Sequence, residues 1–396
     1  MNFADIVACT LVVAGIMLAF PVVVLLLEIV AACLARPAPV TNVARRPSLA
    51  VLVPAHDEAL GIVSAVEGIR PQLWGGDRLL VIADNCTDAT ACLAGRAGAE
   101  VIERVDKSRR GKAFALDYGL RKIAVKPPDV VVVVDADCRL SAGCLSILAS
   151  KVAETGRPVQ AQYRLDPPSG VASPYLQIAT FAFAVKSIAR PLGLSVLGQP
   201  CPLQGTGMAF PWSIISGADL ASSEIVEDLV LGLELVRAAH LPLFCPEAQV
   251  FSAFPSSWDG QQGQRTRWET GHLNVIFTRL PGLLVEAVKS RNLPLLAMIA
   301  DAAVPPLAFL ALLILIHAAL SVLMLVLVGH VLSVIIALGI IAAFFVSIVL
   351  AWFRVGRGLI SFKALVLAPF YILSKLSLYG RILIGRKVGW VRSQRG

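Results

Sequence analysis

The chain is poor in charge, with only 16% charged residues among its 396 and 57% hydrophobic residues. Soluble proteins average about a quarter charged. The apolar residues gather in residues 5–34 and roughly 295–385, and they leave residues 41–292 with the composition of a soluble domain. This distribution excludes a purely soluble protein. It predicts a polar domain that is attached to a membrane by the segments that precede and follow it in the sequence.

Paired cysteines and zinc-ligand spacings are also lacking. The eight cysteines include no C-x-x-C pair, and no histidine lies at the sequence spacing from them that is typical of zinc ligands. These absences exclude a zinc module and argue against a disulfide framework. Isolated cysteines in apolar segments act as small hydrophobic residues. We therefore expect the polar domain to lie in a reducing compartment, the cytosol.

A basic stripe with interleaved aromatic residues, the mark of nucleic-acid binding, is missing as well. The net charge is +8, but many of the cationic residues flank the apolar segments. Examples are Arg36, Arg45, Arg46, Arg354, Arg357, Lys363, Arg386 and Lys387. Such placement suits anionic lipid headgroups. We predict membrane lipid as a partner and no nucleic acid.

The N-terminal apolar run lacks the preceding positive charge that a signal peptide carries, because the first cation is Arg36. Residues 5–34 are long enough to cross a bilayer. They predict a retained anchor with its N-terminus outside and the following domain in the cytosol. Glu28 within this run is expected to reach the interface or a protein partner.

Two strong spans are predicted in the C-terminal part, at about 302–328 and 331–353. A third apolar segment, 364–385, contains Lys375 and Arg381 and is predicted to be interfacial, re-entrant or a weaker span. We therefore divide the chain into an N-terminal transmembrane anchor (1–40), a cytosolic domain with interfacial helices (41–292), and C-terminal transmembrane or interfacial helices (293–396). Residues 173–197 predict either an amphipathic helix on the membrane or a helix packed on a sheet.

Inside the polar domain, short apolar runs alternate with helical patterns. The runs are Ser48–Pro54, Leu79–Ala83, Val101–Glu103 and Val130–Val134, and the helical stretches are 59–69, 89–97 and 112–123. This alternation predicts an α/β fold with a mainly parallel sheet. Ligands bind such sheets at the carboxyl ends of the strands. Asp57, Asp84 and Asp135 each come just after a run, so we group them in one site.

Asp135 and Asp137 follow a run of five valines. Two carboxylates two residues apart at a strand end can bind one hard cation, Mg²⁺ or Mn²⁺, and the phosphates it bridges. The alternative for this pair is a turn or a helix cap.

Three further segments line the predicted pocket. Asp84 is placed to accept a hydrogen bond from a uracil N–H, and Asp57 with Glu58 would close the other side of a nucleotide pocket. Lys112 follows Arg110 and Gly111 at a helix start, where cations and backbone N–H groups suit phosphate. The alternative for the segment of Asp84 is a helix cap, and the alternative for Asp57 and Glu58 is a plain loop. The alternative for the segment of Lys112 is a solvated basic loop.

A base and a sugar platform are predicted further along the chain. Glu227 and Asp228 lie in a helical window, 223–239, among apolar neighbours, and a buried carboxylate there would act as a base near neutral pH. Gln264, Arg267 and Trp268 share one helix face. Trp268 suits a sugar ring and Arg267 a diphosphate. Gly205, in a glycine-flanked turn, would let the backbone approach an acceptor, unless the turn is a mere linker.

In combination and in this order, the motifs resemble those of the membrane-embedded family-2 glycosyltransferases, the group of cellulose, chitin and hyaluronan synthases and ceramide glucosyltransferase. The resemblance covers about residues 45–280 and the flanking spans. It implies a nucleotide-diphosphosugar transferase (GT-A type) domain, with uridine at Asp84, the metal at Asp137 beside Asp135, and Asp228 as general base. Gln264, Arg267 and Trp268 would bind donor diphosphate and acceptor. Val226 stands where many synthases have Thr before Glu-Asp.

The predicted activity is inverting, metal-dependent transfer from a UDP-sugar to a growing polysaccharide, with a possible export partner. The alternative is transfer to a lipid acceptor. A transporter subunit is disfavoured, because the spans hold almost no buried polar pairs. An inactive scaffold is disfavoured by the intact acidic set.

Overall fold

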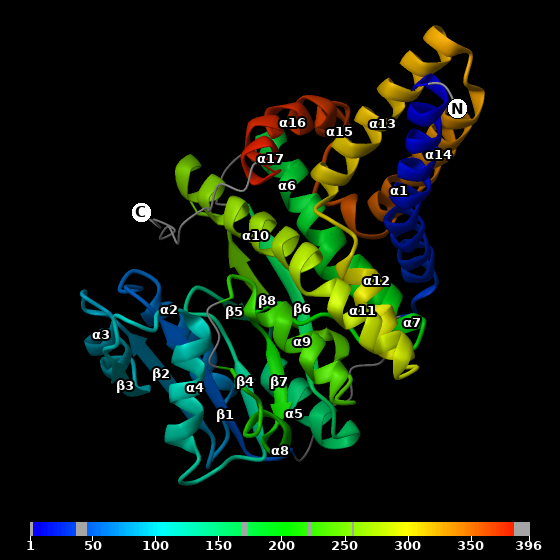
Figure 1. The fold of residues 1–396 in the computed structure, drawn as a ribbon. Helices are drawn as coiled ribbons and strands as arrows, with labels where there is room; N and C mark the ends of the chain where they lie inside the picture. Colours follow the sequence, from blue (N-terminus) through cyan, green and yellow to red (C-terminus); the bar gives the residue numbers. More distant parts are fainter. Residues whose placement is uncertain (1–2, 37–45, 168–172, 221–223, 256, 384–396) are drawn as a thin grey trace. The chain divides into compact units, whose positions relative to one another are not determined.

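The computed structural model describes residues 3–36, 46–167, 173–220, 224–255 and 257–383, and Figure 1 shows the chain as a ribbon. The chain forms two compact units. The apolar unit comprises residues 1–35, 167–198 and 255–396, and the sheet unit comprises 36–166 and 199–254.

The sheet unit is built on an eight-stranded sheet in the order β3-β2-β1-β4-β7-β6-β8-β5. Strands β1 to β4 are mutually parallel, and β7 runs antiparallel to its neighbours β4 and β6. The strands are β1 (Leu49–Ala55), β2 (Arg78–Asp84), β3 (Glu100–Arg104), β4 (Val130–Val133), β5 (Arg139–Leu140), β6 (Val159–Asp166), β7 (Met208–Pro211) and β8 (Leu243–Ala253). The four predicted strands are therefore present, and the predicted α/β class is confirmed.

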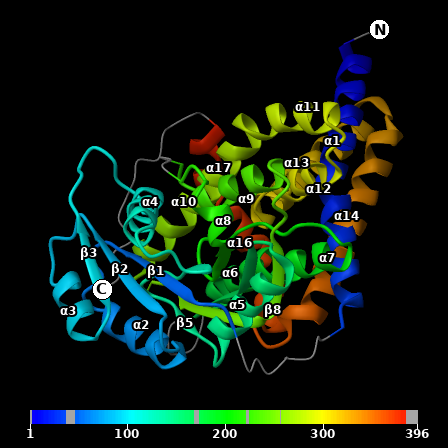
Figure 2. The ribbon, with the colours of Figure 1, turned by 90° about the horizontal axis from the view of Figure 1, so that it is seen from below.

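Helices cover both faces of the parallel half of this sheet. Figure 2 shows α4 on one side of β1 to β3, with α2 and α3 on the other. The helices are α2 (Ile62–Ile69), α3 (Thr90–Arg96), α4 (Lys112–Ile123), α5 (Cys144–Thr155), α8 (Trp212–Ile215) and α9 (Glu227–Arg237). Burial on both faces explains why β1 and β4 are continuously apolar rather than alternating. The core between α4 and the sheet includes Leu52, Ile82 and Leu116.

The apolar unit is entirely helical within the described residues. Its helices are α1 (Phe3–Leu34), α6 (Pro174–Ala184), α7 (Arg190–Val196), α10 (Trp258–Thr278), α11 (Leu280–Lys289), α12 (Leu293–Ala302), α13 (Leu307–Val328), α14 (Val331–Ala351), α15 (Phe362–Val366), α16 (Ala368–Ser374) and α17 (Leu376–Leu383). Single π-helical turns, Val185–Ala189 and Trp352–Gly356, follow α6 and α14. Helices α1, α13 and α14 pack together (Figure 1).

Three helices of the described chain are long and apolar enough to cross a membrane: Asp5–Leu34, Leu307–Val328 and Val331–Gly356. Residues 364–383 of the predicted segment 364–385 instead form parts of α15 to α17, each too short to span a bilayer, which needs about 20 residues, and residues 384 and 385 lie outside the described residues. The Arg265 guanidinium on α10 donates to the Tyr371 hydroxyl of α16 (3.2 Å). Residues 173–197 form α6, a π-turn and α7, and α7 packs against α1.

A buried ion triad joins three segments of the apolar unit. Arg190 Nε of α7 donates to Glu28 Oε2 of α1 (2.8 Å), and Arg190 Nη2 donates to Asp301 Oδ1 of α12 (2.6 Å). All three side chains are at most 6% exposed. Beside them, Gly193 lets α7 approach α1 so closely that an added Cβ would lie 2.0 Å from the Glu28 carbonyl oxygen. The protein partner expected for Glu28 is therefore Arg190.

Replacing the arginine of this triad should destabilise the apolar unit strongly. Arg190→Met leaves two buried carboxylates without their cation, which typically costs about 3–5 kcal/mol. The thermal unfolding midpoint of the full chain in detergent should fall clearly. Arg237→Met is the matched control, because Arg237 pairs with Glu234 at an exposed site, where a pair is worth about 0–1 kcal/mol. Equal midpoints for the two variants would show that the triad does not hold the unit together.

Candidate active site

The carboxyl ends of parallel strands β1, β2 and β4 lie at one edge of the sheet, because the registers align Ala55 with Ala83 and Leu52 with Val133. The loops that follow these strands carry the acidic residues singled out in the sequence. Ligands of α/β proteins usually bind at this edge of the sheet, in contact with the loops that follow the strands. The sequence-based grouping of these loops therefore agrees with the sheet topology.

At the centre of this edge, Lys112 joins two of the predicted segments. Its Nζ is paired with Asp135 Oδ1 and donates to the Gly205 carbonyl oxygen (2.7 Å). Burial opposes the charge of Lys112, but Asp135, Glu227 and Asp228 together raise its pKa. The ammonium thus lies among carboxylates rather than at the surface. Its positive charge offsets part of the negative charge of these carboxylates.

Gly205 lies beside Asp228, and its backbone has a φ of +85°. Residues other than glycine rarely adopt this backbone conformation. A Cβ at this position would also lie 3.3 Å from Asp228 Oδ2 and 3.4 Å from Lys112 Nζ. The structure therefore brings together Lys112, Asp135, Gly205 and Asp228, which are separated by up to 116 positions in the sequence.

The predicted metal pair lies at the same edge. Ligand atoms of Asp135, Asp137 and Cys138 all fall within 4.8 Å of one another. Burial raises the pKa of the Cys138 thiol well above its ordinary value, so the carboxylates are the natural ligands. Ser252 Oγ donates to Asp137 Oδ2 (2.6 Å), and the Asp135 N–H donates to Thr206 Oγ1 (3.1 Å). Oxygen ligands held in this way fit Mg²⁺ or Mn²⁺.

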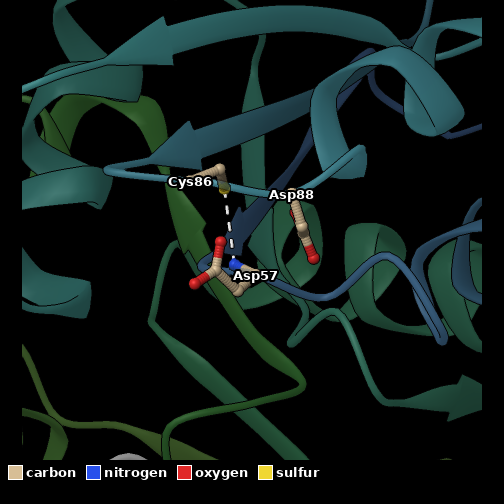
Figure 3. A group of neighbouring side chains, drawn as sticks. All are labelled: Asp57, Cys86 and Asp88. Atoms are coloured by element: carbon tan, nitrogen blue, oxygen red, sulfur yellow. Dashed lines mark hydrogen bonds between the residues drawn. The ribbon is translucent and has the colours of Figure 1, made fainter.

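A second group with metal-like spacing consists of Asp57, Cys86 and Asp88 (Figure 3). Its polar atoms hold loops together: the Asp57 N–H donates to Cys86 Sγ (3.4 Å), as drawn in Figure 3, and the Asp57 carboxylate accepts from the Thr87 N–H (2.6 Å). Asp88 accepts from the N–H groups of Ala59 (3.1 Å) and Thr90 (2.9 Å). These contacts favour a structural role for this group in the loops, and Asp135 with Asp137 stays the predicted metal pair.

Asp57 and Glu58 lie in the loop after β1, as predicted. Asp57 adopts a φ of +51°, unusual for a residue other than glycine. The Glu58 N–H donates to Thr90 Oγ1 (2.8 Å), which ties this loop to the start of α3. The loop with Asp57 and Glu58 thus forms part of the border of the site. The contact of these two residues with a nucleotide stays a prediction.

Asp84 accepts hydrogen bonds from two neighbouring side chains, and its contact with a nucleobase stays a prediction. Arg104 Nη1 lies 2.5 Å from Asp84 Oδ1, and Asn85 Nδ2 lies 3.0 Å from the same oxygen. Sequence reasoning missed Arg104, although the parallel register aligns it with Asp84. A cation at the end of the neighbouring strand was the available signal. The remaining oxygen, Oδ2, is the one that suits a nucleobase N–H.

Glu227 and Asp228 form the first turn of α9, which begins at Glu227 rather than near residue 223. Residues 221–223 of the predicted window lie outside the described residues. Carboxylates are favoured at this position by the helix dipole. Burial and the adjacent Asp228 raise the pKa of Glu227 to about 7. Asp228 Oδ1 accepts the Leu229 N–H (2.9 Å), so its second oxygen lies toward Gly205.

Gln264, Arg267 and Trp268 lie on α10, which belongs to the apolar unit. The expected helix, and with it the shared face, is confirmed. Gln264 is buried, and its Oε1 has no hydrogen-bond partner within the described part of the chain. The rings of Trp268 and Phe183 of α6 lie 5.8 Å apart, centroid to centroid. The roles of these three residues toward donor and acceptor stay predictions.

Comparison with known proteins agrees with this geometry. Residues 47–271, more than half of the chain, match the family model described as glycosyltransferase like family 2. The chain belongs to this family. It is also 25% identical over 249 residues to the probable glycosyltransferase YdaM of Bacillus subtilis. That match covers 59% of this chain and 57% of YdaM, so the chain spans little more than half of this relative.

The fold of this family-2 glycosyltransferase is also found in a solved structure. The mannosyltransferase PcManGT of Pyrobaculum calidifontis, in complex with GDP-Man and Mn²⁺, is similar with a TM-score of 0.52 and 19% identity. The match covers 84% of this chain and 97% of that structure. The GT-A-type fold predicted from the motifs is thus confirmed.

Proposed function

We propose that this glycosyltransferase transfers a sugar from a UDP-sugar to a growing polysaccharide at the cytoplasmic membrane, with inversion at the anomeric carbon. The observation that supports this most is the convergence of Asp228, Lys112, Asp135 and Gly205. It supplies a candidate base beside a cation and a metal-binding pair at the ligand-binding edge of the sheet. The family, the fold and the Mn²⁺ in PcManGT agree with metal-dependent transfer from a nucleotide-sugar donor.

In the proposed reaction, Asp228 accepts the proton of an acceptor hydroxyl. The freed oxygen attacks the anomeric carbon, while the bond from that carbon to the diphosphate oxygen breaks and UDP leaves. Asp135 and Asp137 would hold Mg²⁺ or Mn²⁺, which when bound neutralises charge on the diphosphate. Lys112 adds a positive charge at the same place, which favours the departing anion. Gln264, Arg267 and Trp268 are proposed to bind the donor diphosphate and the acceptor.

The proposed setting is a multi-pass membrane protein with its catalytic domain in the cytosol. Support comes from the three helices that are apolar and long enough to span, and from cations that flank the apolar segments. Within this setting residues 1–40 anchor the chain, 41–292 carry the catalysis, and 293–396 return to the membrane. A polymer acceptor is favoured, with a membrane lipid as the alternative acceptor and an export protein as a further partner.

The experiment that tests this proposal uses the full chain in nanodiscs with Mn²⁺ or Mg²⁺. UDP-glucose, UDP-N-acetylglucosamine, UDP-galactose, UDP-glucuronic acid and GDP-mannose are compared for nucleotide release. The product is then sized, and its anomeric configuration is read by NMR. An inverted, high-molecular-weight product from a UDP-sugar is expected. A lipid-extractable product would move the acceptor to a lipid, and release from GDP-mannose alone would overturn the proposed UDP donor.

A further inference from the structure

The ends of β2 and β3 carry opposite charges that the sheet register aligns. Asp84 is the register partner of Arg104, and their side chains form an ion pair in which each is only 8% exposed. Separating such a pair would leave a charge uncompensated in a poorly solvated place. Arg104 therefore fixes the orientation of the carboxylate that is proposed to meet the nucleobase.

Arg104 also holds the loop that follows β3. Its Nη2 donates to the Arg109 carbonyl oxygen (2.7 Å) and to Asp106 Oδ2 (3.1 Å). One guanidinium thus bridges two carboxylates, Asp84 at the end of β2 and Asp106 in the loop. Asn85 reinforces the bridge, because its Oδ1 accepts from the Asp106 N–H (2.8 Å) and its N–H donates to the Arg104 carbonyl oxygen (2.7 Å).

Asp106 is in turn the organising residue of this loop. Its Oδ1 accepts from Ser108 Oγ (2.6 Å), from the Ser108 N–H (3.0 Å) and from the Arg109 N–H (3.1 Å). The Ser108 hydroxyl foremost, and these other donors with it, hold the pKa of Asp106 well below its ordinary value. The carboxylate is therefore ionised at neutral pH and keeps its contacts with Arg104 and Arg109.

The loop that Asp106 organises is basic and leads directly into the site. Lys107, Arg109 and Arg110 are exposed, and the next helix begins at Lys112, whose ammonium meets Asp135. Cations at a helix start suit a diphosphate. The contacts therefore run from the proposed nucleobase contact, Asp84, through Arg104 to the backbone of Arg109, and the chain continues from there to Lys112.

We propose that Arg104 and Asp106 are positioning residues that couple the nucleobase contact at Asp84 to the basic loop 107–112, so that the site recognises a nucleoside diphosphate as one unit. This inference rests on the function proposed above. Arg104 orients Asp84, Asp106 shapes the loop, and the contact between them links the two. A nucleoside monophosphate, which lacks the second phosphate, gains little from the shaped loop, whereas a nucleoside diphosphate gains from both parts.

The test measures binding of UDP and UMP, and of GDP and GMP, to the full chain in detergent with Mn²⁺ by calorimetry. Asp106→Asn should weaken diphosphate binding about 10-fold, as expected for loss of charge-assisted hydrogen bonds, and should leave monophosphate binding nearly unchanged. Arg104→Gln should weaken both, because it also releases Asp84. Asp84→Asn combined with Asp106→Asn should lose less than the product of the two single losses, since both act through Arg104.

Glu100→Gln is the matched control, because Glu100 lies at the opposite end of β3 and pairs with Arg78; it should bind both nucleotides like the unchanged protein. Asp106→Glu should recover part of the diphosphate preference. If Asp106→Asn does not fold, Ser108→Ala should show a smaller loss confined to the diphosphates. Equal weakening of mono- and diphosphates by the Asp106 or Ser108 variant would overturn the coupling. Absence of any nucleotide binding by the unchanged protein would instead overturn the proposed function.

Discussion

Asp228→Asn should lower the rate of sugar transfer about 10²–10⁴-fold, the usual contribution of a general base. The amide has nearly the same shape as the carboxylate but cannot accept the proton of the acceptor hydroxyl. Asp228 Oδ2 lies near Gly205 rather than in the nucleobase region at Asp84, so nucleotide binding should change little. Initial rates with the preferred donor, together with calorimetric UDP binding, measure the two effects separately.

Glu234→Gln is the control for this prediction, because it lies on the same helix at an exposed site and pairs with Arg237. It should transfer sugar at the normal rate. Full activity in Asp228→Asn would exclude Asp228 as the base. If Asp228→Asn is inactive but also fails to bind UDP, its role is in binding rather than in proton transfer.

The same acidic pair should shape the pH profile of the unchanged protein. Since burial and the adjacent Asp228 raise the pKa of Glu227 to about 7, Glu227 holds a proton below neutral pH and loses it above. Transfer should therefore rise with pH through about 7. Glu227→Gln removes the group that titrates near pH 7 and should abolish this rise. An unchanged profile in that variant would show that the pair does not set the acid limb.

The parallel half of the sheet could be predicted because its strands are buried on both faces and so are apolar without interruption. Leu79–Ala83 and Val130–Val134 are examples, and both occur as strands with nearly the expected ends. The acidic residues after these strands could then be grouped, because parallel strands end at one edge. Topology alone thus accounts for the position of Asp135 and its neighbours.

Contacts made by side chains from distant segments could not be predicted in the same way. The contacts of Lys112 with Asp135 and the Gly205 carbonyl oxygen could not be foreseen, while its role toward phosphate stays a prediction. Arg104 was not identified, because its position at the end of a strand signals a cation near the site but not the register that pairs it with Asp84. The ion pair between Arg104 and Asp84 was therefore not predicted.

In the apolar unit, too, the long helices could be predicted from the sequence, whereas the contacts between their side chains could not. The three helices that are long and apolar enough to cross a membrane follow from length and hydropathy, whereas the partner of Glu28 depends on how α7 and α12 pack beside α1. Segment 364–385 was ambiguous because its Lys375 and Arg381 interrupt an otherwise apolar run. Its described residues, 364–383, form short helices, of which α16 is tied to α10 by the Arg265–Tyr371 hydrogen bond.

Asp137→Asn should weaken Mn²⁺ binding by at least about 10–100-fold, since even partners outside the ligand shell contribute that much. An amide oxygen is a poorer ligand for a hard cation than a carboxylate. Transfer should fall with the metal affinity and recover partly at high Mn²⁺. Removal of metal from the unchanged protein by EDTA should abolish transfer, and Mn²⁺ should restore it. Binding is measured by electron paramagnetic resonance of free Mn²⁺, independently of activity.

Asp129→Asn provides the control, because Asp129 lies at the opposite end of the valine run and accepts from the Ser48 hydroxyl (2.7 Å) and N–H (2.9 Å). It should lose some stability and no metal affinity. Asp57→Asn separates the two acidic groups in the same experiment: because the Asp57 carboxylate holds the Thr87 N–H, its loss should disturb the loop without weakening Mn²⁺ binding. Weaker Mn²⁺ binding in Asp57→Asn than in Asp137→Asn would move the metal to the Asp57, Cys86 and Asp88 group.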